Sequence, residues 1–416
     1  MNWKSIPGFI AILCLYTTSP AQVLDNTVYQ DHIKTVRLYP STNEIGLPVI
    51  NFNSTDKLIF TFDHLGDESR TYYYTLVHCD YNWEPTIQNT YEYIDGFARA
   101  TIDDYNYSAN TRNAYINYKL EIPNNDMNIT QSGNYALVVY EDSPDEPIIT
   151  RRFMVAEKVV GIDPRITFPR SRTDYRSYHE VLFNVNHQSL NINNPYQEIK
   201  ATVMQNQRWD NAYIGIAPRF LRNGVMDFDH NGATVFEAGR EFRRFDIRSM
   251  RFKGVGVRAI QNNDIYLLFD QIRSNEKYFI ETDYNGQYFI DVLEYRNRSI
   301  EADYAHVHFS LAMNTPVPDG KLYVGGTFNE YAATPENQLK WNPETNMYET
   351  QALLKQGYYD YIYYYMPQNS DVKQVSLTEG NDYDAENQYD IFIYYKAFGE
   401  RYDRLIGYTS FNSRAN

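Results

Sequence analysis

The chain has little cysteine and, beyond its first residues, no long hydrophobic run. Only two of its 416 residues are cysteine, which excludes a small fold held by several disulfides. No later stretch approaches the roughly 20 consecutive apolar residues that a transmembrane helix needs. The glycine-rich phosphate loop and the Gly-x-Ser-x-Gly elbow of serine hydrolases are also missing, so two common enzyme classes lack sequence support.

Positive charge is scarce as well. The chain has 38 Lys and Arg residues against 53 Asp and Glu residues, a formal net charge of −15. Nucleic-acid binding depends on Lys and Arg side chains that neutralise phosphates. Nucleic acid is therefore not an expected partner.

Residues 1–21 form a predicted signal peptide. Lys4 precedes an apolar stretch at residues 9–15, and Ala21 presents a small side chain at the expected cleavage site. Cys14 follows a leucine, whereas lipidation requires a small residue at that place, so we do not expect a lipoprotein. Export leaves a chain with one cysteine and a net charge of −16.

Aromatic residues are abundant and favour β-strands. The sequence contains 40 Tyr and 22 Phe, which suit a half-buried pleated surface. Residues 115–122 alternate, with apolar side chains at the even positions, so we expect a strand whose even face points inward. A processed length of about 395 residues allows two to four domains. The predicted fold class is all-β, with tandem immunoglobulin-like β-sandwich domains.

Turn residues divide the chain into three expected units. The first boundary falls near Gly161 and Pro164, where a predicted strand ends. Residues 277–282 and 287–293 are predicted to pair as a hairpin, because the Asn-Gly step between them favours a tight turn. The expected sandwich units are residues 22–157, 158–300 and 301–416.

Few residues are candidates for chemistry. His306 and His308 are two apart on a predicted strand and share one face, as do His78 and Asp80. Zinc needs three or four ligands, and no third one stands at a suitable spacing. Cys79 is interpreted as a buried structural residue. We therefore expect no metal, no cofactor, no catalytic residue and no enzyme activity.

The segment 240–258 reverses the sign of the chain, with seven basic and two acidic residues. One interpretation is docking on an acidic partner or on anionic headgroups. The other is that the arginines line the solvated face of a strand whose Phe242, Phe245 and Ile247 pack inward. Exposed loop tyrosines are further contact candidates. The candidate partner-binding residues are Arg243, Arg244 and Arg248.

Several ordered motifs resemble the type IX secretion system plug protein family. They lie at residues 77–83, 93–97, 108–111, 132–135, 151–153, 241–246, 283–286 and 302–311. Together they cover most of the chain that remains after export.

The resemblance implies a non-catalytic periplasmic protein that is associated with the outer membrane. It would bind the periplasmic opening of the translocon β-barrel and seal it when no substrate is in transit. Membrane contact is expected only through this partner, and no small-molecule substrate is expected. Residues 412–416 show no dedicated sorting domain of exported substrates, so retention in the periplasm is expected.

The third expected unit also resembles the glycogen-recognition type of immunoglobulin-like sandwich, through residues 322–329 and 356–361. Tyr331 stands where that family offers a tryptophan to a sugar, and Trp341 is expected in the core. The resemblance therefore implies the fold without the sugar. Two alternatives remain, a carbohydrate-binding envelope module and a transmembrane barrel, although the predicted strands are short and irregularly spaced for a barrel.

Overall fold

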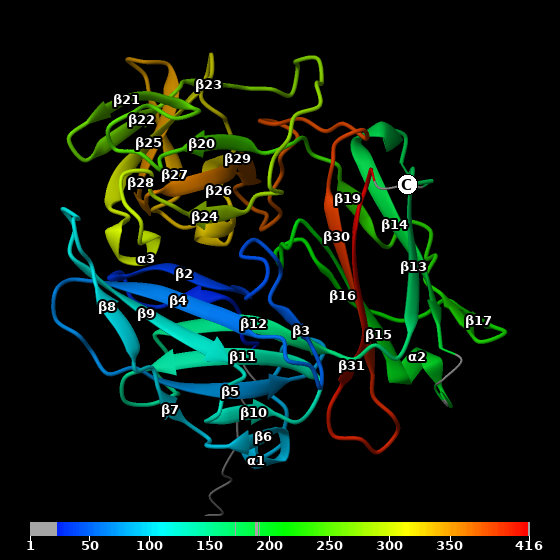
Figure 1. Cartoon of the computed structure of the whole chain (residues 1–416). Helices are drawn as coiled ribbons and strands as arrows, with labels where there is room; N and C mark the ends of the chain where they lie inside the picture. The colour runs from blue at the N-terminus through cyan, green and yellow to red at the C-terminus, as the bar shows by residue number, and fades with distance from the viewer. Residues whose placement is uncertain (1–22, 171, 188–189, 191, 415–416) are drawn as a thin grey trace, which may run out of the picture.

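The protein is seen here as a computed structural model, which describes residues 23–170, 172–187, 190 and 192–414. The predicted signal peptide, residues 1–21, lies outside the described residues. Nearly all regular structure is β. The strands form three units, and each unit lies beside the other two (Figure 1). None of the described helices has the length and apolar character needed to cross a membrane. The predicted all-β tandem sandwich fold is confirmed.

The first unit packs two sheets around one core of aliphatic and aromatic side chains. One sheet has the order β1-β12-β11-β5-β7, with β3 parallel to β12, and the other has the order β2-β4-β9-β8. A small pair, β6 and β10, follows helix α1 (Thr90–Tyr93). The strands are β1 (Thr27–Val28), β2 (Ile33–Pro40), β3 (Val49–Asn51), β4 (Leu58–Leu65), β5 (Tyr73–Cys79), β6 (Ile94–Gly96), β7 (Ala100–Thr101), β8 (Asp104–Tyr107), β9 (Tyr115–Ile122), β10 (Met127–Ile129), β11 (Gly133–Tyr140) and β12 (Ile149–Ala156).

The second unit combines two distant parts of the chain. Its sheets have the orders β13-β14-β18-β17, with β19 beside β14, and β16-β15-β30-β31. Short helices η1 (Tyr175–Ser177) and α2 (Pro195–Glu198) precede β14 and β15. The strands are β13 (Gly161–Thr167), β14 (Tyr178–Asn186), β15 (Ile199–Gln205), β16 (Tyr213–Ile216), β17 (Phe220–Arg222), β18 (Val225–Asp227), β19 (Val235–Glu237), β30 (Gln388–Tyr395) and β31 (Arg404–Asn412).

The third unit is a ten-stranded sheet that curls around a main core, with a smaller hydrophobic cluster beside it. Its order is β20-β29-β26-β27-β28-β25-β22-β21, with β23 beside β25 and β24 beside β29. It also contains α3 (Arg298–Glu301) and η2 (Thr327–Asn329). The strands are β20 (Arg243–Asp246), β21 (Val257–Gln261), β22 (Asp264–Leu267), β23 (Asp270–Gln271), β24 (Tyr288–Ile290), β25 (Tyr304–Ala312), β26 (Gly320–Gly325), β27 (Gln338–Asn342), β28 (Met347–Lys355) and β29 (Gly357–Pro367).

These sheets group the strands differently from the predicted ranges 158–300 and 301–416. Strands β20 to β24 were placed in the middle range, but they join the sheet of β25 to β29. Strands β30 and β31 were placed in the last range, but β30 pairs with β15 of the second unit. The third unit is thus inserted into the second, and this long-range pairing leaves no local signal in the sequence.

The predicted hairpin of residues 277–282 and 287–293 is wrong. Residues 277–282 form no strand, and Phe279 and Ile280 are both 69% exposed. The Asn-Gly step does turn the chain, with positive φ at Asn285 and Gly286. After the turn, however, β24 pairs with β29 because the core of the third unit buries Tyr288 and Ile290.

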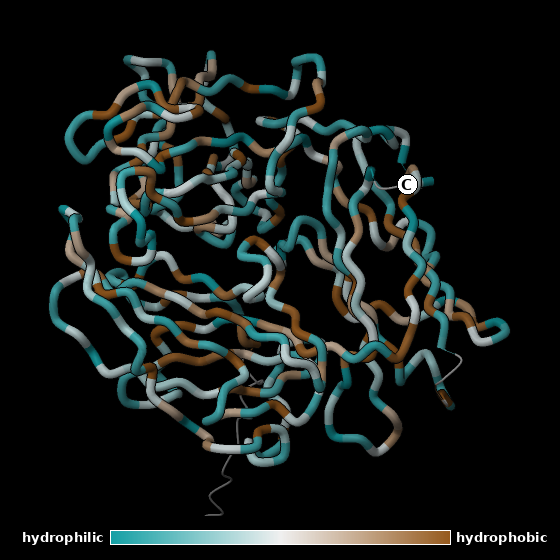
Figure 2. Tube along the Cα trace, viewed as in Figure 1, coloured by the Kyte–Doolittle hydropathy of each residue, from teal (hydrophilic) through white to brown (hydrophobic). Residues whose placement is uncertain are grey.

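Burial within strands follows the sequence pattern closely. Hydrophobic and hydrophilic residues alternate along many strands of the three units (Figure 2). In β9 the even-numbered residues from Ile116 to Ile122 are all buried, which confirms the predicted inward face. Tyr115, on the opposite face, is also buried, because its hydroxyl donates to the Ala302 carbonyl of the third unit at 2.8 Å. Contacts between units therefore bury residues that the strand pattern assigns to solvent.

Candidate functional site

A buried ion pair joins the first unit to the third. Lys355 Nζ, at the end of β28, lies 2.7 Å from Asp63 Oδ2 of β4, and the two side chains are 2% and 0% exposed. The Tyr304 hydroxyl donates to the same carboxylate at 2.6 Å, and Asn117 Nδ2 donates to its other oxygen at 2.7 Å. Burial lowers the pKa of Lys355, while the charge of Asp63 opposes that shift. Side chains of the protein itself are the hydrogen-bond and ion-pair partners of Asp63, so this carboxylate has a structural role.

A second contact between these units surrounds Asp303, which precedes β25. Its carboxylate accepts hydrogen bonds from the backbone N–H groups of Arg112 at 2.8 Å and Asn113 at 3.1 Å. The Asn113 side chain also donates to the Tyr304 carbonyl at 2.8 Å. These bonds fix the β8–β9 connection against the start of β25.

The first and second units share a buried aromatic and basic cluster. The Arg152 guanidinium lies over the rings of Trp83, at 4.6 Å, and Trp209, at 5.1 Å. Its Nε donates to the Leu24 carbonyl at 2.7 Å. Nearby, the Tyr394 hydroxyl donates to Asn134 Oδ1 at 2.9 Å, across the same boundary. This interface has a continuous hydrophobic core of its own.

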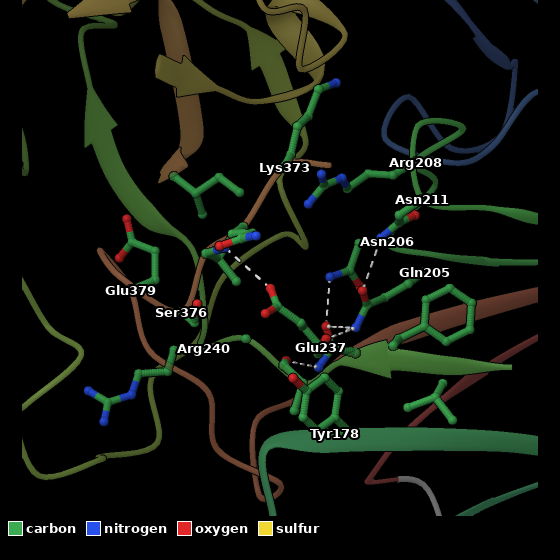
Figure 3. A pocket seen from close by; sticks show the side chains of 18 of the residues that line it. Tyr178, Gln205, Asn206, Arg208, Asn211, Glu237, Arg240, Lys373, Ser376 and Glu379 are labelled. Atoms are coloured by element: carbon green, nitrogen blue, oxygen red, sulfur yellow. Dashed lines mark hydrogen bonds between the residues drawn. The ribbon is translucent and has the colours of Figure 1, made fainter. Parts of the chain in front are cut away.

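A cavity of about 470 Å³ lies between the second and third units (Figure 3). Amide side chains at the end of β15 line one part of it, and a segment that follows β29 lines another. Gln205 and Asn206 both donate to Asn387 Oδ1, at 3.1 and 2.7 Å. Burial raises the pKa of the Glu237 carboxyl, which accepts a hydrogen bond from the Val375 N–H at 3.2 Å.

Three of the charged side chains at this cavity pair with one another. Arg208 binds Asp210 through two nitrogens, at 3.0 and 2.8 Å, and Lys373 binds the same carboxylate at 2.9 Å. Although burial acts to raise the pKa of Asp210, these two cations hold it at about 2. Arg240 donates to backbone carbonyls of the third unit. These contacts make the cavity a polar junction between the second and third units.

The three predicted partner-binding arginines have different environments. Arg243 is 9% exposed, and it pairs with Asp270 at 2.8 Å and Glu379 at 3.0 Å. The expectation that Arg243 lies on a contact surface is wrong, because these two carboxylates hold it inside the third unit. Arg244 is half-buried and donates to the Thr282 carbonyl. Arg248 pairs with Asp246 at 2.7 Å.

The inward packing of the three apolar residues agrees with the second interpretation of this segment, although Arg243 does not lie on the solvated face that it assigned to the arginines. Phe242, Phe245 and Ile247 are 5%, 0% and 1% exposed. The uncompensated positive charge of the segment lies further along the chain, where Arg251, Lys253 and Arg258 are exposed. The sequence pattern gave no reason to expect that these three residues are exposed while the arginines before them are paired.

The histidine and cysteine candidates occupy structural positions. His308 Nε2 lies 2.8 Å from Asp264 Oδ1, and its ring stacks on Tyr266. Burial lowers the pKa of His78 to about 4 and raises the pKa of the Cys79 thiol to about 12. Among the described residues, no group of three or more His, Cys, Asp or Glu side chains is arranged to hold a metal ion.

A pair of buried carboxyl groups in the third unit gave no recognisable signal in the sequence. Asp283 accepts hydrogen bonds from the backbone N–H groups of Phe242 and Asn285, and Asp360 accepts them from Tyr284 and Gly286. Burial raises the pKa of Asp283 to about 6. Burial, together with the charge of Asp283, raises the pKa of Asp360 to about 7. These groups shape the Asn-Gly turn from inside.

Tyr331 and Trp341, the two aromatic residues considered at the possible sugar site, both contact other side chains. Tyr331 is 2% exposed, and the Arg208 guanidinium covers its ring at 4.2 Å. Trp341 packs against Tyr348 at the edge of the core, with a distance of 5.2 Å between ring centroids. The ring of Tyr331 is therefore covered, and Trp341 is partly buried against the core.

Large apolar side chains are exposed on several loops, which include residues 279–280 and two further surfaces. One is the end of the molecule formed by α1 and the β30–β31 loop, where Arg401 pairs with Glu92 at 2.8 Å and where Ile87 and Phe398 are exposed. The other lies on the loops that flank β21 and β22, with Phe252 75% and Leu268 54% exposed. Contiguous exposed apolar patches mark contact surfaces, whereas single exposed apolar side chains are common on folded proteins.

Taken together, the geometry defines a multi-sandwich β protein whose interior charges join its three units and whose contact candidates are loops. Residues 33–157 match the family model described as the type 9 secretion system plug protein 1st domain. A crystal structure of a hypothetical protein from Parabacteroides merdae is similar over 94% of this chain and 99% of that chain, with 35% sequence identity and a TM-score of 0.89. Comparison with curated proteins gives no match.

The chain belongs to the type IX secretion system plug protein family. The family match falls on the first unit, and the likeness to the solved structure extends over the second and third units. The protein is therefore involved in type IX secretion, and its family is one of the cell envelope.

Proposed function

We propose that this protein is a periplasmic plug, which binds the periplasmic opening of the type IX outer-membrane translocon barrel and seals it when no substrate is in transit. It acts by shape and contact, without catalysis. Membership of the plug family supports this role, since the matched first domain spans residues 33–157. A seal requires a surface complementary to the opening and a body that keeps its shape.

The observation that carries the proposal is the way in which the three units are joined. Domains linked only by small polar contacts move relative to one another by default. Here the first and third units share the buried Asp63–Lys355 pair, and the first and second share the core around Arg152. Arg208 of the second unit covers Tyr331 of the third. Each unit is thus fixed to the other two, which suits a rigid stopper.

The test is a native pull-down of the tagged protein from cell envelopes solubilised in mild detergent, followed by mass spectrometry. The expected result is near-stoichiometric recovery of a very large outer-membrane barrel. A strain that lacks the protein should also admit large hydrophilic dyes that the parent strain excludes. Recovery of the protein alone at every detergent tried, with unchanged dye entry, would contradict the sealing role.

A further inference from the structure

The loops that flank β21 and β22 form a compact surface, which we call the apolar–basic tip. Its apolar residues are Phe252, Val255, Leu268 and Phe269, which are 75%, 56%, 54% and 47% exposed. Its basic residues are Arg251, Lys253 and Arg258, all exposed. Strands β21 and β22 lie on the side of the third unit away from the second unit (Figure 1).

The two loops of the tip are held in a fixed arrangement. Asp246 N–H donates to the Val255 carbonyl at 2.9 Å, which ties the first loop to β20. Leu268 N–H donates to the Gly256 carbonyl at 2.8 Å, which ties the second loop to the first. A Cβ atom at Gly254 would approach the Asp246 carbonyl oxygen to 2.3 Å, so the first loop packs directly on the strand. These contacts therefore hold the two loops, and the apolar side chains that they carry, in a fixed position relative to β20.

The basic residues of the tip lack carboxylate partners among the described residues, although acidic residues lie close by in the chain. Asp246 pairs with Arg248, and Asp270 pairs with Arg243, so internal arginines already neutralise these two carboxylates. Arg258 instead lies over the Phe269 ring at 4.5 Å. The tip thus carries three uncompensated positive charges in a chain whose net charge is −15.

We propose that the apolar–basic tip binds the surface of an anionic phospholipid membrane directly. Proteins that lie in a membrane interface combine apolar side chains, which enter the acyl boundary, with Lys and Arg, which stay at the headgroup phosphates. Phe252, Val255 and Leu268 supply the first group, and the three cations supply the second. The apolar side chains project from loops and do not line a groove, which favours a fluid surface over a shaped protein partner.

This inference goes beyond the sealing role and departs from the expectation that membrane contact is made only through the translocon. It does not depend on the translocon, because it concerns lipid alone. It also gives the segment 240–258 two parts with different roles. The arginines up to Arg248 hold the third unit together, and the residues from Arg251 onward bind lipid.

The test is co-flotation of the full chain without its signal peptide with vesicles of phosphatidylcholine alone or mixed with phosphatidylglycerol. The protein should float with the mixed vesicles and not with phosphatidylcholine alone, and added salt should weaken the binding because it screens charge. Lys253→Glu should reduce partitioning at least about fivefold, and Phe252→Ser about tenfold or more. The matched controls, Lys321→Glu and Phe279→Ser, change exposed residues of the same types elsewhere and should bind as the parent protein does.

Equal recovery with both kinds of vesicle, or loss of binding in the control variants, would overturn the inference. The inference is also overturned if the protein binds no vesicles and if Lys253→Glu and Phe252→Ser no longer recover the barrel in the pull-down. That result would assign the tip to the translocon. If the protein binds lipid but recovers no barrel in the pull-down, membrane binding by the tip is supported and the sealing role is rejected. Circular dichroism spectra of all variants should match that of the parent protein, because the substituted side chains are exposed.

Discussion

Lys355 and Asp63 lie 292 positions apart in the sequence, yet their side chains meet at 2.7 Å inside the protein. One belongs to the third unit and the other to the first, and both are withdrawn from solvent. A charge in such a place is costly unless its partner is present. The pair therefore makes the stability of each unit depend on the position of the other.

Removal of one member of this pair should destabilise the protein strongly. Lys355→Met leaves Asp63 charged and buried, so the free energy of unfolding should fall by about 3–5 kcal/mol, as measured by urea denaturation. The double variant Asp63→Asn/Lys355→Met should be less destabilised than the two single effects added together, because no charge is left unpaired. Lys321→Met changes an exposed lysine and serves as the control. Equal stability of Lys355→Met and Lys321→Met would refute a structural role for the pair.

Neighbouring arginines of β20 should respond differently to substitution. Arg243→Met breaks buried contacts with Asp270 and Glu379, so a loss of about 3–5 kcal/mol is expected. Arg244→Met should cost less than about 1 kcal/mol, because Arg244 is only half-buried and pairs with no described carboxylate. Thermal and urea unfolding of the two variants measure the difference. If both variants unfold at the same temperature and the same urea concentration, the buried ion pairs of Arg243 do not determine stability.

The Asp360 carboxyl should make stability depend on pH. Its pKa in the folded protein is about 7, against an ordinary value of 3.8, because burial and Asp283 disfavour its charge. The folded state then holds more protons than the unfolded state between these values, so this group's contribution to stability falls as pH rises from 4 to 7.

Urea denaturation of the parent protein and of Asp360→Asn at several pH values isolates this contribution. The slope from one such group is at most about 1.4 kcal/mol for each pH unit. The parent protein should therefore lose stability relative to Asp360→Asn as the pH rises through this window. Asp371→Asn alters an exposed carboxyl and should follow the parent profile. A constant difference between parent and Asp360→Asn across the window would count against the raised pKa.

The thiol of Cys79 should be inert in the folded protein. It is fully buried, and burial raises its pKa to about 12, so neither access nor thiolate is available at neutral pH. In a chain with Cys14→Ser, a thiol-reactive dye should label no cysteine under native conditions and one equivalent in denaturant. Rapid native labelling would show that the core between the first and second units opens readily.

Local patterning in the sequence was sufficient for the class of fold. Alternation in residues 115–122 predicted both a strand and its buried face. Phe245 and Ile247, two positions apart, lie in one core as one interpretation of their segment expected, whereas Phe242 packs in a separate cluster. Such inferences succeed because the side chains of a strand alternate between its two faces, whatever the strand pairs with. The family resemblance rested on motifs that lie in order along the chain, and the match over residues 33–157 confirms it.

The site was harder to predict, because the fate of a charged residue depends on its partners. Arg243 and Arg251 read alike in the sequence, yet one is held by Glu379 and the other is exposed. The partner carboxylate is more than a hundred positions away, so no spacing rule identifies it. Tyr331 shows the same limitation, since Arg208 from another unit covers its ring.

Periodicity and ordered motifs are local properties of the chain, so the sequence alone indicated the β-sandwich class and the family. The return of β30 to β15, which inserts the third unit into the second, became visible only in the folded protein. The same is true of the contact between Asp63 and Lys355 and of the exposure of Lys253. Those outcomes depend on contacts between residues far apart in the chain, whose free energy is realised only when the units pack together.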